Sequence, residues 1–298
     1  MKKVLFLLGT FALFPILVAG CGMTASLVSR ALPDNDWPKK RIMLMPATDL
    51  TGIPLDELLD TVSAGFSKTL GGKGSFDVYH GNESKKPHSF KPGQSFVPEL
   101  MREAREMGIN AIIFETVNPI EANPDKTGIW PFRRKAWRFT LSMNVDIVDA
   151  NGGTILLSKE IVHTMTLSEE GAKDKKERSP NVETKKRALR QCLPDIIEKA
   201  ATDATLSLNG RVWTGTIVSV DDKRILINAG RDVGLRPGIV FEVFGEGESI
   251  TSLKGQTYHL PGPKVGEIRT VRIEPRRSWA EPISGTAFKS GQLIKVKK

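Results

Sequence analysis

The sequence feature that most constrains the fold is the alternating stretch WRFTLSMNVDIVDANGG, residues 137–153. Its apolar side chains fall on one side of an extended chain and its polar side chains on the other. The apolar set is Trp137, Phe139, Leu141, Met143, Val145 and Ile147. A period of two is typical of a strand with one apolar and one polar face. Such a strand lies in a half-buried sheet, or it crosses an outer membrane with lipid on its apolar side.

Residues 1–20 have the pattern of a secretory signal. Two lysines precede an apolar run from Val4 to Ala19, which is shorter than the roughly 20 residues of a spanning helix. The run ends in Val-Ala-Gly-Cys, which resembles the lipobox of bacterial lipoproteins. The resemblance implies that residues 1–20 are removed and that Cys21 becomes the lipidated first residue. Because Gly22 follows it rather than Asp, enteric sorting rules favour the outer membrane, with the protein facing the periplasm.

The charge and the cysteines narrow the expected partners. Removing residues 1–20 takes away two lysines, so the formal net charge falls from +9 to +7. A basic periplasmic protein is expected to meet anionic lipid headgroups, cell-wall polymer, polysaccharide or acidic proteins, and not nucleic acid. With Cys21 lipidated, Cys192 has no partner for an intramolecular disulfide. Cys192 lies in an apolar-periodic helical stretch, which predicts a buried, inert thiol.

The mature length predicts two domains after a tether. Residues 21–40 are small and polar and form the lipidated tether, residues 41–207 form an α/β domain, and residues 208–298 form a small β domain. In the first domain, the apolar runs of RIMLMPATDLTGIP and INAIIFETV predict buried strands. Helices are predicted from about Leu55, from about Phe96, and over the stretch around Pro194, which is expected to kink or restart its helix.

From about Asn209 the chain becomes a series of short apolar runs separated by glycines. The segments TGTIVSV, KRILINAG, GIVFEVF, VGEIRTVRI and GQLIKVK predict five short strands. Five short strands in about ninety residues are typical of a small barrel or curled sheet. The fold class is therefore an α/β (α+β) sheet-and-helix domain followed by a small, all-β, barrel-like domain.

This order of segments resembles a known group of envelope proteins. The lipobox, RIMLMPATDLTGIP, a helix, GINAIIF, a long hairpin and a last helix are similar to the periplasmic domain of curli-secretion channel (CsgG-like) lipoproteins. The ring-forming lipoprotein of Pel polysaccharide export has the same layout. The stretch GTIVSVDDKRILINAGRDVGLRPGIVFEVFGEG resembles the C-terminal domain of the flagellar ring protein FlgT. The resemblance implies non-enzymatic envelope assembly or export, often as rings, and it supplies no catalytic residues.

The residues themselves also give no sign of catalysis. The histidines have neither helical i,i+4 spacing nor a cysteine neighbour, so no metal site is predicted. No phosphate-binding loop of the P-loop type and no nucleophile elbow is present in the sequence. We therefore expect no enzymatic activity, no cofactor and no metal.

Two basic segments are candidate contact sites. The segment IWPFRRKAWRF combines aromatic and basic side chains that suit a membrane interface or the acidic patch of a partner. Its candidate residues are Trp130, Phe132, Arg133, Arg134, Lys135 and Trp137. The alternative is a loop whose aromatic rings cap the domain core. The charged runs KDKKER and KKRALR either bind anionic polymer or form a solvated face.

The turn after the alternating strand decides between scaffold and pore. A three-residue loop pairs Met143 with Lys159, and a two-residue turn pairs Met143 with Glu160. Either register places a charge in the middle of the face that lipid would cover, which costs roughly 2–4 kcal/mol for a lysine. We therefore expect a structural or assembly component of a flagellar or export-related envelope machine, self-associating in a ring. The alternative is a subunit of an oligomeric, curli-type secretion channel.

Overall fold

The computed structural model describes residues 38–54, 57–72, 75–82, 98–168, 179–222, 224–251, 253 and 257–297. Cys21, the signal and most of the tether lie outside these residues, as do Leu55, Phe96 and the run KDKKER. Residues 37–298 belong to one compact unit. Two sheets, each with its own apolar core, make up most of that unit.

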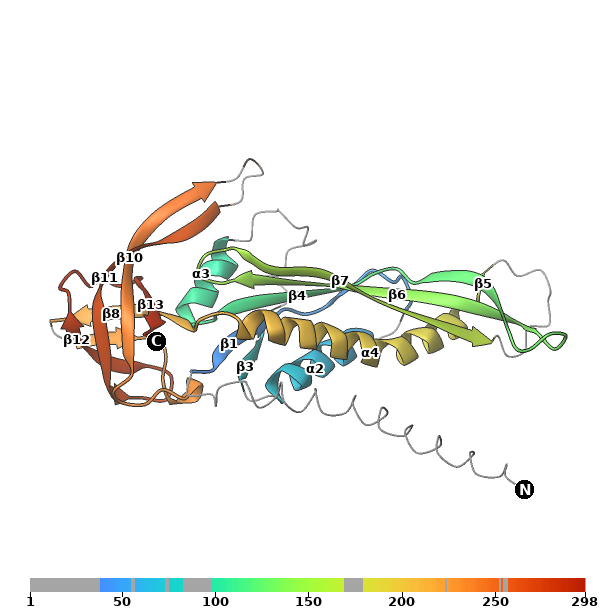
Figure 1. Cartoon of the computed structure of the whole chain (residues 1–298), viewed down its shortest axis with the longest axis horizontal. Helices are drawn as coiled ribbons and strands as arrows, with labels where there is room; N and C mark the ends of the chain where they lie inside the picture. The colour runs from blue at the N-terminus through green and yellow to red at the C-terminus, as the bar shows by residue number, and fades with distance from the viewer. Residues whose placement is uncertain are drawn as a thin grey trace, which may run out of the picture. The chain divides into compact units, whose positions relative to one another are not determined.

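The first sheet has mixed strand directions (Figure 1). Its strands are β1 (Lys40–Leu44), β2 (Thr48–Asp49), β3 (Phe76–His80), β4 (Ala111–Val117), β5 (Glu121–Thr127), β6 (Arg134–Asp149) and β7 (Ile155–Ser168). β1 pairs in parallel with β3 and β4, whereas β6 pairs antiparallel with β4, β5 and β7. The buried runs predicted as strands are confirmed in β1 and β4, whose apolar residues are almost fully buried.

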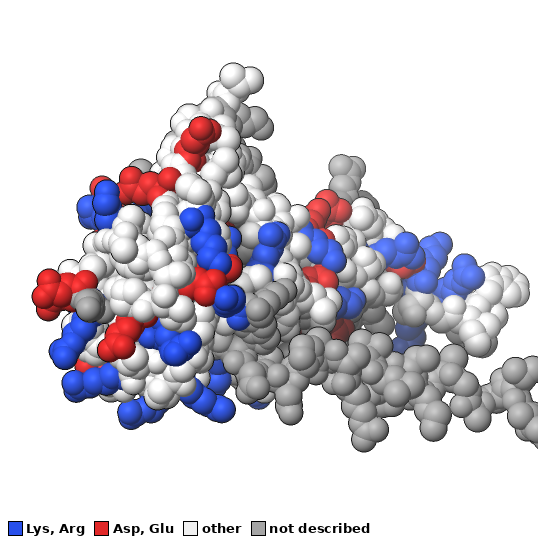
Figure 2. All heavy atoms as spheres, turned by 60° about the vertical axis from the view of Figure 1, so that its left-hand side comes forward, with Lys and Arg blue, Asp and Glu red and all other residues white. Residues whose placement is uncertain are grey.

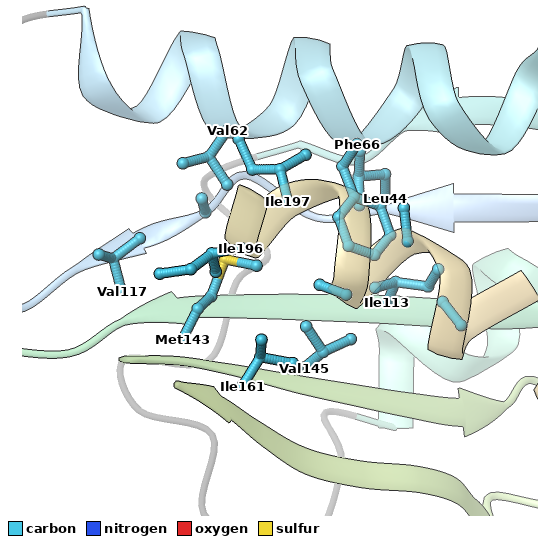
Figure 3. Packing of buried hydrophobic residues seen from close by; sticks show 14 of the residues in the cluster. Leu44, Val62, Phe66, Ile113, Val117, Met143, Val145, Ile161, Ile196 and Ile197 are labelled. Carbon is cyan, nitrogen blue, oxygen red and sulfur yellow. The ribbon is translucent and has the colours of Figure 1, made fainter. Parts of the chain in front are cut away.

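Helices cover both faces of this sheet. The helices α2 (Leu58–Gly71) and α4 (Val182–Asn209) lie on one face, where Phe66 and Ile197 pack with strand residues such as Met143 (Figure 3). The helix α3 (Pro98–Glu106) covers a second core on the other face. α4 continues through Pro194 as one helix, so of the two alternatives predicted there, a kink or a restart, the restart is wrong. None of the described helices combines the length and the apolar character needed to cross a membrane.

The alternating strand is the central element of the sheet. All six apolar residues predicted to share a face are at most 1% exposed in β6, and α4 packs on that face. The apolar side of β6 is therefore occupied by protein. The sequence left two alternatives for this strand, a half-buried sheet or a membrane crossing. The arrangement in the structure is that of the half-buried sheet.

Both predicted hairpin registers are wrong. Met143 lies opposite Ile161, and Val145 lies opposite Lys159. The Asp149 N–H donates to the Thr154 carbonyl at 2.8 Å, so the turn holds four residues rather than two or three. A bulge next to Ile147 then shifts the pairing by one further residue. The buried Ile161 thus faces the core where the predictions placed a charge.

Lys159 reaches a partner on the helix above it. Its Nζ lies 2.7 Å from Asp203 Oδ2 of α4, and both side chains are partly exposed. We expect Lys159→Ala to lower the free energy of unfolding by about 0.2–1 kcal/mol, because partly exposed ion pairs contribute little. Lys199→Ala, which removes an exposed lysine of α4 that has no ion pair among the described residues, is the matched control. Equal urea midpoints for the two variants would contradict the prediction.

Cys192 is buried among the α4 side chains of the main core, as predicted. Burial, followed by the nearby Asp195 carboxylate, raises the pKa of the Cys192 thiol to about 11. The thiol is therefore protonated at neutral pH and poorly nucleophilic, which agrees with the inert thiol expected from the sequence.

The second sheet closes on itself in a barrel-like ring (Figure 1). In the described part of the chain its strands are β8 (Thr214–Asp221), β9 (Arg224–Ile227), β10 (Val240–Thr251), β11 (Thr257–Ile273), β12 (Ser278–Ser284) and β13 (Leu293–Val296). The predicted five strands are present, and β12 is an addition to them. A short 3-10 helix, η2 (Arg231–Val233), connects β9 to β10. The outer halves of β10 and β11 form a hairpin that projects from the ring.

A buried arginine joins the two sheets. The Arg41 guanidinium of β1 pairs with the Asp232 carboxylate of η2 and donates to the Asn228 carbonyl at 2.6 Å. It also donates to the carbonyl of Met107 at 3.2 Å. Glycine is required at position 108 for two reasons. Its φ is +72°, and an added Cβ would lie only 2.9 Å from the Asn228 carbonyl oxygen. These contacts fix the end of the first sheet against the ring.

Candidate functional site: an apolar and basic hairpin tip

The candidate site is the turn between β5 and β6, which we call the hairpin tip and define as residues 126–135. The sequence predicts a loop over residues 118–134, but residues 121–127 form β5 and pair with β6. The last cross-strand pair before the turn is Thr127 with Arg134. Within the described residues, which end at Ser168 in this strand, β7 pairs with β6 from Ala136 onward, and the tip extends beyond that last pair.

Local backbone geometry holds the turn. Gly128 has φ +101°, a conformation that favours glycine. The Phe132 N–H donates to the Ile129 carbonyl at 2.7 Å and closes the turn. The residues between Gly128 and Arg133 are held at the end of two paired strands as a result, and their side chains project outward.

Three large apolar side chains are exposed at this turn. Ile129 is 84% exposed, Trp130 is 79% exposed and Phe132 is 81% exposed. Single exposed apolar residues are ordinary, but three within four residues at the end of a projecting hairpin form a patch that water solvates poorly. The patch is therefore a candidate contact surface.

Basic side chains surround the patch. Arg133, Arg134 and Lys135 are exposed, and Lys126 lies opposite Lys135 across the hairpin. None of the four has an ion pair with another described residue. Farther from the turn, the Asp125 carboxylate pairs with Arg138 at 3.0 Å and is thereby neutralised. Lys and Arg side chains gather beside the uncharged end of this hairpin at the right of Figure 2. The tip therefore presents a net positive, apolar surface.

The structure brings five of the six predicted contact residues together at the tip: Trp130, Phe132, Arg133, Arg134 and Lys135. Trp137 is the exception and corrects the prediction. It is 1% exposed and packs with Phe139 and Ala188 in a small core beneath α4. The alternative of aromatic residues that cap the core is thus correct for Trp137, but not for Trp130 and Phe132.

Two residues of the tip were not singled out from the sequence. Ile129 carries no pattern of its own, and its exposure follows from its place in the turn. Lys126 joins the basic group only because β5 pairs with β6, a pairing that the predicted loop did not contain. The second basic run, KKRALR, lies in the first half of α4, where Ala188 and Leu189 are buried and the arginines differ in exposure.

The described residues contain no group of three or more His, Cys, Asp or Glu side chains that could hold a metal ion. The exposed apolar and basic side chains of the tip are typical of a binding surface rather than of a catalytic site. Apolar aromatic side chains beside lysine and arginine bind anionic lipid surfaces and acidic protein patches.

No protein-family model matches the chain, and no curated protein matches it. Among solved structures, the chain is similar to a hypothetical protein from Chlamydia trachomatis, with 12% identity over 58% of this chain and 99% of that chain and a TM-score of 0.39. It is also similar to a PelC dodecamer from Paraburkholderia phytofirmans, with 14% identity over 55% and 86% of the two chains and a TM-score of 0.32.

A third similar structure is a lipoprotein from Neisseria meningitidis, with 15% identity over 52% of this chain and 99% of that chain and a TM-score of 0.29. At these identities and TM-scores the likenesses do not bear on function.

Proposed function

We propose that this chain is a non-enzymatic lipoprotein, anchored in the outer membrane through Cys21 and facing the periplasm. In this proposal it acts as a structural or assembly component of an envelope machine, a flagellar basal body or an export apparatus, and self-associates in a ring. The hairpin tip is its docking element and binds an anionic lipid surface. The single observation that carries the docking role is the exposed apolar and basic tip.

The physical argument is that the tip matches a membrane interface in both of its components. Aromatic side chains are favoured at the level of lipid headgroups, and basic side chains near an anionic surface each contribute roughly 1 kcal/mol. In this proposal the acyl chains on Cys21 anchor the protein, and a second contact with the lipid surface adds to that attachment. The tip supplies such a contact without any strand that crosses the membrane.

The secretion-channel alternative would use the β6–β7 hairpin as a lipid-facing element. The burial of the apolar face of β6 beneath α4 favours the structural role over this alternative. To expose that face to lipid, α4 would have to leave the main core, and the buried Ile196 and Ile197 would become exposed.

The docking role is tested with residues 21–298 carrying Cys21→Ala, which removes the lipid anchor. We expect the protein to sediment with vesicles of phosphatidylglycerol and not with vesicles of phosphatidylcholine. Replacing Arg133, Arg134 and Lys135 together by glutamine should weaken binding by roughly a hundredfold, at about 1 kcal/mol for each charge. Trp130→Ser with Phe132→Ser should weaken it as well.

Leu206→Ser is the matched control, because Leu206 is a 67% exposed apolar residue of α4 outside the tip. It should leave vesicle binding unchanged. Equal binding by the tip variants and the unmodified chain would contradict the docking role.

Light scattering on the same protein tests self-association, since a monomer at all concentrations would contradict a ring.

A further inference from the structure

A cleft of about 660 Å³ lies where the first sheet meets the closed ring. The turn of the β6–β7 hairpin forms one wall through Asp149 and Gly152. The end of α4 and the residues that follow it form another through Leu208 and Arg211. The projecting hairpin of β10 and β11 closes a third side. The backbone N–H of His259 in that hairpin donates to the Gly152 carbonyl at 3.1 Å, which ties the hairpin to the turn. The cleft is therefore built by segments distant in the sequence.

Four cationic side chains line the cleft: Lys40, Arg105, Arg211 and Lys295. None of them forms an ion pair with another described residue. Two carboxylates, Asp149 and Glu246, line the same space, so the formal balance is two positive charges. The ion pairs found among the described residues all lie outside this cleft, and no carboxylate forms an ion pair with its cations.

The surroundings of these cations favour an added anion. Burial lowers the pKa of Lys40, because its ammonium has lost water without gaining a carboxylate partner. The Asp149 carboxylate is engaged by its own turn, where it accepts from the N–H groups of Asn151 and Gly152 at 3.1 Å each. Burial raises the pKa of Asp149, with Arg211 and Lys295 acting in the opposite direction. An anion placed between the cations would therefore compensate charges that Asp149 leaves only partly balanced.

The remaining lining combines aliphatic side chains with glycines and with polar side chains. Leucines from four segments contribute to it: Leu156, Leu208, Leu260 and Leu293. No Phe, Tyr or Trp side chain lines the cleft, and its histidine, His259, is hydrogen-bonded through Nδ1 to the Ser249 hydroxyl at 2.9 Å. Several of the amide and hydroxyl groups are already engaged, since Asn110 and Asn151 both donate to Thr214 at the junction. A ligand in the cleft would thus meet positive charge together with aliphatic surface. The volume of the cleft is within the range of small-molecule sites.

We propose that this cleft binds a small amphiphilic anion, a phosphate or carboxylate head group attached to a short aliphatic body. The head group lies among Lys40, Arg211 and Lys295, and the body packs on the leucines. The site is separate from the hairpin tip, so it does not depend on the proposed docking function.

The test uses the full chain in phosphatidylcholine nanodiscs, titrated by calorimetry with empty nanodiscs as the blank. The probes are hexyl phosphate, hexanoate, inorganic phosphate and hexanol. Each buried methylene is worth about fourfold in affinity, so hexyl phosphate or hexanoate should bind at least about tenfold more tightly than phosphate or hexanol. Whichever of the two amphiphiles binds more tightly identifies the head group.

Variants locate the binding. Arg211→Ala and Lys295→Ala should each weaken the amphiphile by about tenfold or more, because each removes a charged hydrogen-bond donor. Arg211 is exposed, so its replacement should leave the fold intact. Arg224→Ala removes an equal charge at the exposed first residue of β9, outside the cleft, and should have no effect. The proposal is overturned if no amphiphile binds, if phosphate or hexanol binds as tightly, or if Arg224→Ala weakens binding as much as the cleft variants do.

Discussion

Arg41→Met is expected to lower the free energy of unfolding by about 3–5 kcal/mol, since removing one partner of a buried ion pair leaves the other charge uncompensated. The Arg41 side chain is 4% exposed, and the Asp232 side chain is 21% exposed. The guanidinium also satisfies the carbonyls of Asn228 and Met107, which would lose their donors. The expected cost therefore includes both the charge and the hydrogen bonds. Urea unfolding followed by tryptophan fluorescence measures it.

The matched control for Arg41 is Arg272→Met, because Arg272 forms an exposed ion pair with Glu274 at 3.7 Å. We expect that variant to change the free energy of unfolding by less than about 1 kcal/mol. Asp232→Asn is the second measurement at the junction, since it removes the charge but keeps the shape. If Arg41→Met and Arg272→Met had the same urea midpoint, the buried pair would contribute nothing to stability.

The junction also explains why the strands can be predicted from the sequence, whereas the contact between the two sheets cannot. The apolar run of β1 is local and is sufficient to predict a buried strand, whereas Arg41 looks like the charged flank of that strand. Its partner Asp232 is 191 positions further along the chain. Only the packed structure reveals that the arginine is buried.

The strand predictions succeed where the pattern is local and fail where a strand forms only because another strand pairs with it. β6 is predictable because apolar and polar residues alternate along it from Trp137 to Ile147. β5 contains Pro124 and several polar residues, so it resembles a loop, and it is a strand only because β6 offers it an edge. β12 contains Pro282 and is ordered by pairing with β9 and β11. The hairpin register was missed because the four-residue turn and the bulge leave no local signature.

The candidate site was partly predictable. Aromatic and basic residues in one short segment indicate a contact surface, and five of the six named residues lie together at the tip. The segment alone does not indicate where the turn ends and the buried strand begins. The cleft at the junction was not predictable, because its lining comes from segments that have no shared sequence pattern.

Trp137 and Trp130 provide the sharpest test of that boundary. Trp137→Ala should lower the free energy of unfolding by about 3–5 kcal/mol, because it removes a large buried side chain and leaves a cavity. Trp130→Ala should change the free energy of unfolding by less than about 0.5 kcal/mol, since its ring is 79% exposed. Both variants lose one indole, so they are matched in composition, and urea unfolding compares them directly.

The same pair separates stability from docking. Trp130→Ala should weaken the binding of phosphatidylglycerol vesicles while leaving the unfolding midpoint unchanged. Trp137→Ala should do the reverse at temperatures where the variant is still folded, because its ring contacts Phe139 and Ala188 rather than solvent. The alternation of β6 places Trp137 in phase with Phe139 and Leu141, and the adjacent Arg138 points the other way. If Trp137→Ala weakened vesicle binding without loss of stability, the ring would have to leave the core, and β6 would be a mobile surface strand rather than the centre of the sheet.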